Sequence, residues 1–123
     1  MKKGDYEMAH ALMDLRPYRG SNRRVEVAKS DKKLLEVPGY KWPAIEGRKL
    51  LAVGYLFDNP VVAVMPDGVF CMTHAGYNTI TTRTTITAIL QEMGLKYWCT
   101  SIKGVLHCAG ILYTPRESWG VAS

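Results

Sequence analysis

The first apolar pattern along the chain is that of an amphipathic helix. Between residues 5 and 15 the apolar side chains recur at intervals of three and four, which places them on one helical face. These side chains are Tyr6, Met8, Ala9, Leu12, Met13 and Leu15. Pro17 should end the helix, because the residue before a proline disfavours helical backbone.

The following stretch changes from loop to strand. Residues 16–22 are typical of a loop, whereas residues 23–28 alternate as a short strand does, with Val25 and Val27 on one face. Residues 29–47 are dense in proline, glycine and polar side chains, which argues against a long element there.

Three apolar runs in the middle of the chain predict a β-meander. They cover residues 49–57, 61–65 and 69–73. Turn-forming residues separate them, first Asp58-Asn59-Pro60 and then Pro66-Asp67-Gly68. We therefore expect three antiparallel strands.

A second helix is predicted after a threonine-rich stretch. Ile86, Ile89, Leu90 and Met93 fall on one helical face, and Gly94 follows at the position where helices commonly end. We place this helix at about residues 82–93, with Thr81 or Thr82 as its N-cap.

The last strong feature is a β-hairpin formed by residues 97–102 and 105–113. Lys103-Gly104 joins the two strands, and a two-residue turn fixes the register. The predicted pairs are Cys99 with Cys108, Thr100 with His107, Trp98 with Ala109 and Ile102 with Val105. One face of this hairpin should pack against a helix. The whole order predicts an α+β fold, with a mainly antiparallel sheet (meander plus C-terminal hairpin) packed with two helices.

Composition limits the class of protein. The chain has 123 residues, the size of one ordinary domain, and we expect a single domain over residues 1–123. Apolar residues make up 47% and charged residues 22%, which excludes a disordered chain. The chain lacks the apolar stretch of a signal peptide and any run near the ~18 apolar residues of a membrane span. We expect a cytoplasmic protein with no membrane partner, and the odd number of cysteines, three, favours reduced thiols.

The charge of the chain is concentrated in one segment. Residues 16–33 hold seven Lys and Arg against two Asp and Glu, so this segment alone accounts for the net charge of +5. Arginine forks match phosphate oxygens and aromatic rings stack on bases, so the segment is a candidate surface for nucleic acid or an acidic partner. The candidate residues are Arg16, Tyr18, Arg19, Arg23, Arg24, Lys29, Lys32 and Lys33. The alternative is a solvated loop and strand edge, where lysines prevent edge-to-edge pairing.

The threonine-rich stretch is a second candidate site. A helix N-terminus lined with hydroxyl groups and one arginine can bind an anion such as a phosphate, or a partner. The candidate residues are Thr79, Thr81, Thr82 and Arg83. Helix capping also explains one or two threonines at this place.

At this stretch the sequence resembles a group of small, uncharacterised bacteriophage proteins. Their recurring pattern is Gly-aromatic-x-Thr-x-Thr-Thr-x-x-Arg-aliphatic-Asn, followed by aliphatic positions. The matching residues are Gly76, Tyr77, Thr79, Thr81, Thr82, Ile86, Ile89 and Leu90. Thr85 and Thr87 depart from the pattern, standing where it has arginine and asparagine. Residues 55–61 resemble the group's strand-turn-strand lead-in, so the resemblance covers about residues 50–95.

The resemblance implies a phage origin and an accessory role inside a host cell. Small phage proteins of this kind often bind host machinery, as anti-defence and anti-CRISPR proteins do. It implies no particular activity, because a shared fold or origin does not fix a function.

The residues that could take part in catalysis are scattered along the sequence and form no known catalytic motif. His10, His74 and His107 fall in separate elements, and neither a G-x-S-x-G motif nor a phosphate loop is present. We expect no enzymatic activity and no cofactor.

Cysteines and histidines allow a weaker alternative, a small zinc or redox protein. The C-x-x-H pair Cys71 and His74 has Cys99, His107 and Cys108 downstream. On strands, however, Cys71 and His74 would point to opposite sides, as would His107 and Cys108. A Cys99–Cys108 disulfide is geometrically possible, since that pair would lie at a non-hydrogen-bonded site.

The leading hypothesis is a non-enzymatic phage accessory protein that binds nucleic acid or a host complex that handles nucleic acid. The alternative is a protein–protein inhibitor that binds a host enzyme through an exposed aromatic loop carrying Tyr40 and Trp42. The sequence does not define the partner or the oligomeric state.

Overall fold

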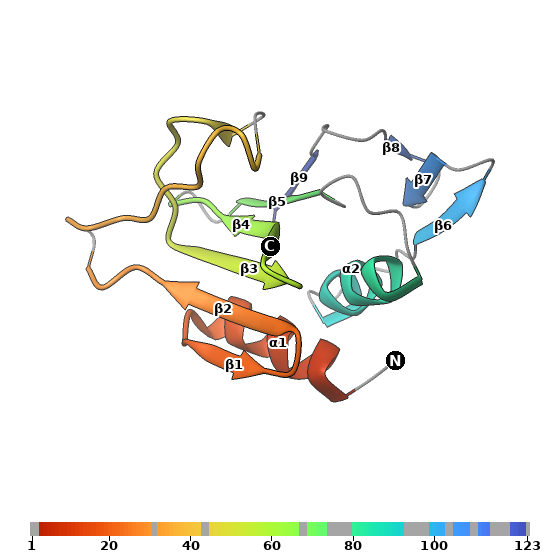
Figure 1. Ribbon diagram of the computed structural model, residues 1–123, viewed down its shortest axis with the longest axis horizontal. Helices are drawn as coiled ribbons and strands as arrows, with labels where there is room; N and C mark the ends of the chain where they lie inside the picture. Colours follow the sequence, from red (N-terminus) through yellow and green to blue (C-terminus); the bar gives the residue numbers. More distant parts are fainter. Residues whose placement is uncertain are drawn as a thin grey trace.

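The computed structural model confirms an α+β fold (Figure 1). It describes residues 3–30, 32–42, 45–66, 69–73, 80–92, 99–102, 105–108, 111–113 and 119–122, with the backbone alone described for residue 69 and from residue 99 onwards. The elements are α1 (Lys3–Asp14), β1 (Tyr18–Gly20), β2 (Arg23–Val27), β3 (Ala52–Leu56), β4 (Asn59–Val64), β5 (Val69–Met72), α2 (Ile80–Glu92), β6 (Cys99–Ile102), β7 (Val105–Cys108), β8 (Ile111–Tyr113) and β9 (Trp119–Ala122).

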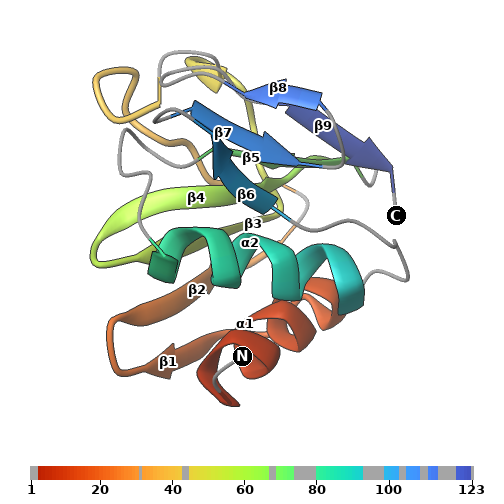
Figure 2. The ribbon, with the colours of Figure 1, turned by 90° about the vertical axis from the view of Figure 1, so that its right-hand side faces the viewer.

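The strands form two antiparallel sheets. The main sheet has the order β1-β2-β3-β4-β5-β9, and β6, β7 and β8 form a smaller one. α1 and α2 pack against each other on one face of the main sheet, and β6 lies beside α2 (Figure 2).

The larger core lies between the two helices and the main sheet. Met8 and Leu12 of α1 and Ile89 of α2 are fully buried there. Gly54 of β3 allows α1 to come close, since a Cβ at this position would lie 2.6 Å from Cε of Met8. Truncating Leu12 to alanine would remove about 2–5 kcal/mol of stability.

A smaller core covers part of the opposite face. It contains Val37, Trp42, Ile45 and Leu50 from the segment between β2 and β3, packed on Val53 of β3. This segment is tied to itself by an isolated bridge between Leu35 and Leu50. The face is not covered at β1 and β2, where alternate side chains remain in contact with solvent.

Most predicted elements are confirmed. The N-terminal helix, the strand at 23–28, the meander and the helix after the threonines are all present. The hairpin register is also confirmed, with Cys99 opposite Cys108 and Ile102 opposite Val105. The predicted pair of Trp98 and Ala109 lies outside the described residues.

The predicted loop at residues 16–22 is wrong in part, because Tyr18–Gly20 forms β1. This three-residue strand is too short to show a period of its own, and its pairing with β2 holds it, with Gly20 opposite Arg23. The turn Ser21–Asn22 is compatible with this hairpin, since Asn22 has φ 60° and asparagine tolerates that region.

The first meander turn lies one residue earlier than predicted. Phe57 and Asp58 have φ 51° and 63°, and Leu56 pairs with Asn59, so the turn is a two-residue one. Two positive φ values match the right-handed twist of the flanking strands. Asn59 and Pro60, predicted as turn residues, therefore begin β4.

Three further features differ from the prediction. The single strand predicted at 105–113 is two strands, β7 and β8, which pair with each other. β9 was not predicted and joins the main sheet beside β5. α2 begins at Ile80, so Thr81 and Thr82 lie inside its first turn and neither is the N-cap.

Candidate functional site

Three side chains form a row across the uncovered part of the main sheet. Arg19 of β1 is opposite Arg24 of β2, which is opposite Tyr55 of β3. Directly paired residues point to the same face. Their neighbour Gly54 faces Met8 of α1, so by alternation this arginine row, defined as Arg19, Arg24 and Tyr55, faces away from the helices.

Arg24 is held in place by three neighbours. Its guanidinium carbon lies 4.1 Å from the centroid of the Tyr55 ring. Nη1 donates to Oδ1 of Asp58 at 2.6 Å, and Nε donates to Oε1 of Glu26 at 3.1 Å. Burial lowers the pKa of Arg24, but the hydrogen bonds that Arg24 donates to Asp58 and Glu26, together with their negative charges, outweigh it and the pKa is raised. The charge of Arg24 is therefore fixed in position and partly compensated.

Arg19 carries the uncompensated charge of the row. Its side chain is exposed and has neither a hydrogen bond nor an ion pair with any described residue. Like charges directly opposite each other on two strands repel, and Asp58 and Glu26 reduce this repulsion by compensating Arg24, while Arg19 is left with its full charge. This arrangement favours a negatively charged ligand.

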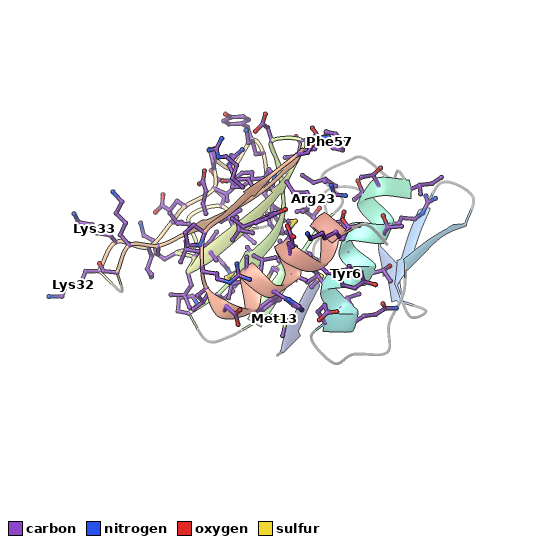
Figure 3. The ribbon with its side chains drawn as sticks, turned by 90° about the horizontal axis from the view of Figure 1, so that it is seen from below. Tyr6, Met13, Arg23, Lys32, Lys33 and Phe57 are labelled. Atoms are coloured by element: carbon purple, nitrogen blue, oxygen red, sulfur yellow. The ribbon has the colours of Figure 1, made fainter. Side chains whose placement is uncertain are left out.

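A basic pocket of about 580 Å³ opens beside the row. The described part of its lining includes four cationic side chains, Arg19, Arg24, Lys29 and Lys33, and one carboxylate, that of Glu26. Lys33 belongs to a tight turn, in which its N–H donates to the carbonyl of Ser30 at 3.1 Å. Lys32 and Lys33 project from the segment that follows β2 (Figure 3).

A second, smaller pocket lies where two hairpin turns meet. This corner pocket has a volume of about 210 Å³. It is lined by Arg19, Gly20, Asn22, Arg23, Arg24, Tyr55, Phe57 and Asp58. The two turns are bound together, since the Phe57 N–H donates to the carbonyl of Asn22 at 2.9 Å. Arg19 and Arg24 line both pockets, which are therefore neighbours.

Five of the eight residues predicted from the basic segment line the basic pocket. They are Tyr18, Arg19, Arg24, Lys29 and Lys33. The phenol of Tyr18 donates to Oε2 of Glu7 at 2.8 Å, and burial together with this hydrogen bond raises its pKa. Arg16 pairs with Asp14 at 3.4 Å outside the pocket, and Lys32 is exposed but not part of the lining.

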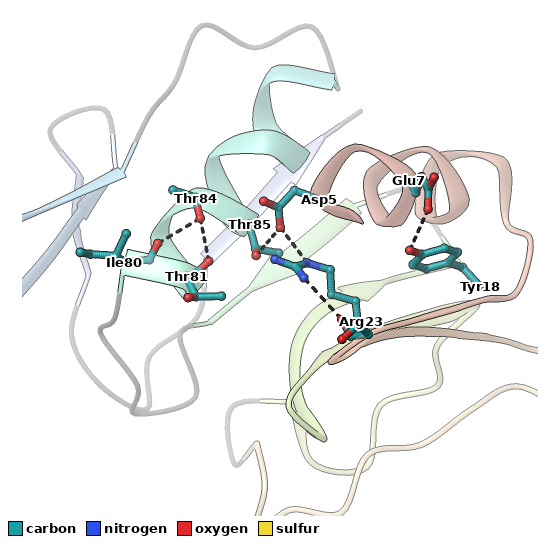
Figure 4. A network of polar contacts seen from close by, with 9 residues as sticks. Asp5, Glu7, Tyr18, Arg23, Ile80, Thr81, Thr84 and Thr85 are labelled. Carbon is teal, nitrogen blue, oxygen red and sulfur yellow. Dashed lines mark hydrogen bonds and ion pairs between the residues drawn. The ribbon is translucent and has the colours of Figure 1, made fainter. Parts of the chain in front are cut away.

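Arg23 corrects the predicted binding surface in part, because it is absent from the lining of the basic pocket and borders only the corner pocket. It is only 8% exposed, and its Nε donates to Oδ1 of Asp5 at 2.8 Å. Thr85 donates to the same oxygen at 2.7 Å, so this network joins α1, β2 and α2 (Figure 4). Arg23 shares the strand face of Val25 and Val27, and this alternation was the sequence signal for a buried arginine.

The threonine-rich stretch is used largely for structure in its described part. The Thr84 hydroxyl donates to the carbonyls of Ile80 and Thr81, both at 3.0 Å (Figure 4). Thr82 is only 4% exposed, so its predicted contact with a ligand in solvent is wrong. Thr81 and Arg83 are partly exposed in the first turn of α2, and Thr79 lies outside the described residues.

The predicted aromatic loop is exposed at one of its two residues. Tyr40 is 83% exposed, whereas Trp42 is 1% exposed and belongs to the smaller core. The prediction that Trp42 is an exposed partner contact is therefore wrong, because the apolar face of β3 and β4 needs a large cover.

The cysteine and histidine set of the zinc alternative falls mainly outside the part of the chain that the structure describes. Cys71 is half-buried on β5. His74 and the side chains of Cys99, His107 and Cys108 lie outside the described residues.

Sequence reasoning missed Tyr55, Phe57 and Asp58 as parts of the site. The sequence signal for Tyr55 was its position on the strand, where alternation places it on the face opposite Gly54. The signal for Phe57 was a large apolar residue next to a turn.

Comparison of the chain with protein-family models, curated proteins and solved structures found no match. None of the described helices is long and apolar enough to cross a membrane.

Proposed function

We propose that the protein is a non-enzymatic nucleic-acid-binding protein whose contact surface is the basic pocket. One observation carries this proposal: among the residues that the structure describes, Arg19, Arg24, Lys29 and Lys33 surround one pocket to which Glu26 contributes the single carboxylate. Their convergence supports a ligand with several negative charges in a row, which is what a phosphodiester backbone offers.

The balance of charge over the chain supports the same ligand. Residues 51–123 contain four Lys and Arg and four Asp and Glu, so they add no net charge. The positive field is thus concentrated at β1, β2 and the segment after β2, where it would steer a polyanion. The phage resemblance extends the proposal to an accessory protein that acts on nucleic acid, or on a complex that handles it, in a host cell.

Paired substitutions at equal net charge test the site. We expect Lys29→Gln with Lys33→Gln to lower the slope of log K against log salt by about 1.4 to 1.8, because two phosphate contacts are lost. The matched control is Lys32→Gln with Arg48→Gln, two exposed residues outside the basic pocket. Equal effects of the two double variants would contradict a localised site.

A nuclease control separates nucleic acid from an acidic protein partner on the same surface. The wild-type protein is used to capture partners from host lysate with and without nuclease treatment. We expect nuclease to release the bound material. A partner that stays bound after nuclease, and is lost in the Lys29→Gln/Lys33→Gln variant, would contradict direct nucleic-acid binding and support the protein alternative.

A further inference from the structure

Phe57 is an aromatic side chain that neither core uses. It is 53% exposed and belongs to neither the larger nor the smaller core. It stands at the first position of the β3–β4 turn with φ 51°, where glycine, asparagine and aspartate are the favoured residues. Packing and turn geometry therefore do not explain a phenylalanine here, whereas a contact with a ligand does.

The corner pocket around Phe57 is small. At about 210 Å³ it lies below the ~300–1,000 Å³ typical of pockets for drug-sized ligands. Its size suits a single flat ring. The Tyr55 ring is covered on one face by Arg24, which makes Phe57 the more accessible aromatic surface of the pocket.

Polar groups surround this aromatic surface. The Asn22 amide and the Asp58 carboxylate offer donors and acceptors to the edge of a ring. Arg19, which the corner pocket shares with the basic pocket, offers a guanidinium that has no hydrogen bond or ion pair with any residue in the described part of the chain. The stacking surface suits the face of a base, the polar groups suit its edge, and the adjacent cation suits the phosphate.

We infer that the corner pocket binds one unpaired base of a single-stranded nucleic acid, with the base stacked on Phe57 and its phosphate contacting Arg19. In a duplex both faces of each base are covered by neighbouring bases, whereas a single strand can turn a base onto an aromatic side chain. This inference rests on the proposed function, because the basic pocket would carry the adjoining phosphates.

The test compares single-stranded and duplex DNA. Fluorescence anisotropy is measured with a labelled oligonucleotide of about 12 nucleotides, alone and annealed to its complement. We expect Phe57→Ala to weaken single-strand binding about tenfold and to leave duplex binding and the salt slope unchanged. Phe57→Trp keeps an aromatic ring and should retain single-strand binding. Tyr40→Ala, which removes another exposed ring, is the control and should change neither affinity.

Two outcomes separate this inference from the proposed function. If single strands bind and Phe57→Ala binds as tightly as the wild type, or loses single-strand and duplex binding equally, base stacking at Phe57 is wrong and the basic pocket stands. If neither DNA form nor the same oligonucleotide as RNA binds, the proposed function and the inference both fail. Phe57→Asn removes the ring but suits the positive φ of the turn. An equal loss of single-strand affinity in Phe57→Asn and Phe57→Ala would show that the loss comes from the missing ring.

Discussion

Nε of Arg23 donates to Oδ1 of Asp5 at 2.8 Å, and the two residues are 8% and 0% exposed. This ion pair connects β2 to α1, and Thr85 brings α2 to the same carboxylate. Arg24, the next residue, is on the opposite face and lines both pockets. Arg23 therefore stabilises the helix layer that supports the strand and borders the corner pocket alone, while Arg24 lines both pockets.

Removing one member of the buried pair should strongly destabilise the protein. We expect Arg23→Ala to lower the free energy of unfolding by about 3–5 kcal/mol, because it leaves the Asp5 carboxylate without its cation in the protein interior. Denaturant unfolding monitored by circular dichroism measures this change. Arg16→Ala breaks the exposed pair with Asp14 and should cost less than about 1 kcal/mol. Similar values for the two variants would show that the buried network is not important for stability.

The end of α1 predicts a stabilising substitution. Leu15 has φ 52° and is 41% exposed, and the bonds from Leu15 N–H to Leu12 and from Arg16 N–H to Ala11 close the helix in a Schellman motif. Leu15→Gly should raise the free energy of unfolding by about 0.5–1 kcal/mol, because glycine adopts positive φ without a Cβ clash. Leu15→Ala keeps the Cβ and should bring no gain. A gain of the same size in both variants would exclude backbone strain as its cause.

Tyr55 predicts a pH dependence of stability. Burial, assisted by the negative charge of Glu26, raises the pKa of Tyr55 above 10.0, although Arg24 opposes the shift. A raised pKa in the folded state means that the folded protein favours the neutral phenol. The stabilisation is complete below pH 10.0, the unfolded value, and is lost as the pH rises through the folded pKa.

Tyr55→Phe tests this dependence. We expect the variant to lose less stability than the wild type when the pH is raised from below 10.0 to above it, because phenylalanine has no proton to release. The measurement is thermal unfolding of both proteins across this range. Parallel pH curves for the two proteins would contradict the raised pKa.

The elements that the sequence predicts well are those with a period of their own. Met8 and Leu12 show the helical period of α1, and the apolar runs of β3 and β4 are bounded by turn residues. β1 has three residues and β9 four, so neither contains enough positions for a period. They become strands because β2 and β5 offer them unpaired edges.

The site was predictable in its charge and not in its geometry. Composition located Arg19, Arg24, Lys29 and Lys33, because charge density is a property of the local sequence. Arg23 is the buried arginine because of Asp5 and Thr85, which are distant in the sequence. Asp5 lies 18 residues from Arg23, and Thr85 lies 80 residues from Asp5. The burial of Trp42 is not predictable from the sequence, because the face of β3 and β4 on which it packs exists only after the sheet has formed.

The salt dependence of nucleic-acid binding by the wild-type protein is the most direct test of the basic pocket. Four phosphate contacts predict a slope of log K against log salt of about −3, so the affinity should fall by about 50-fold or more for a fourfold rise in salt. Titrations of one labelled oligonucleotide at a series of salt concentrations give this slope. Absence of binding at low salt, or binding with a slope near zero, would contradict nucleic-acid binding at the basic pocket.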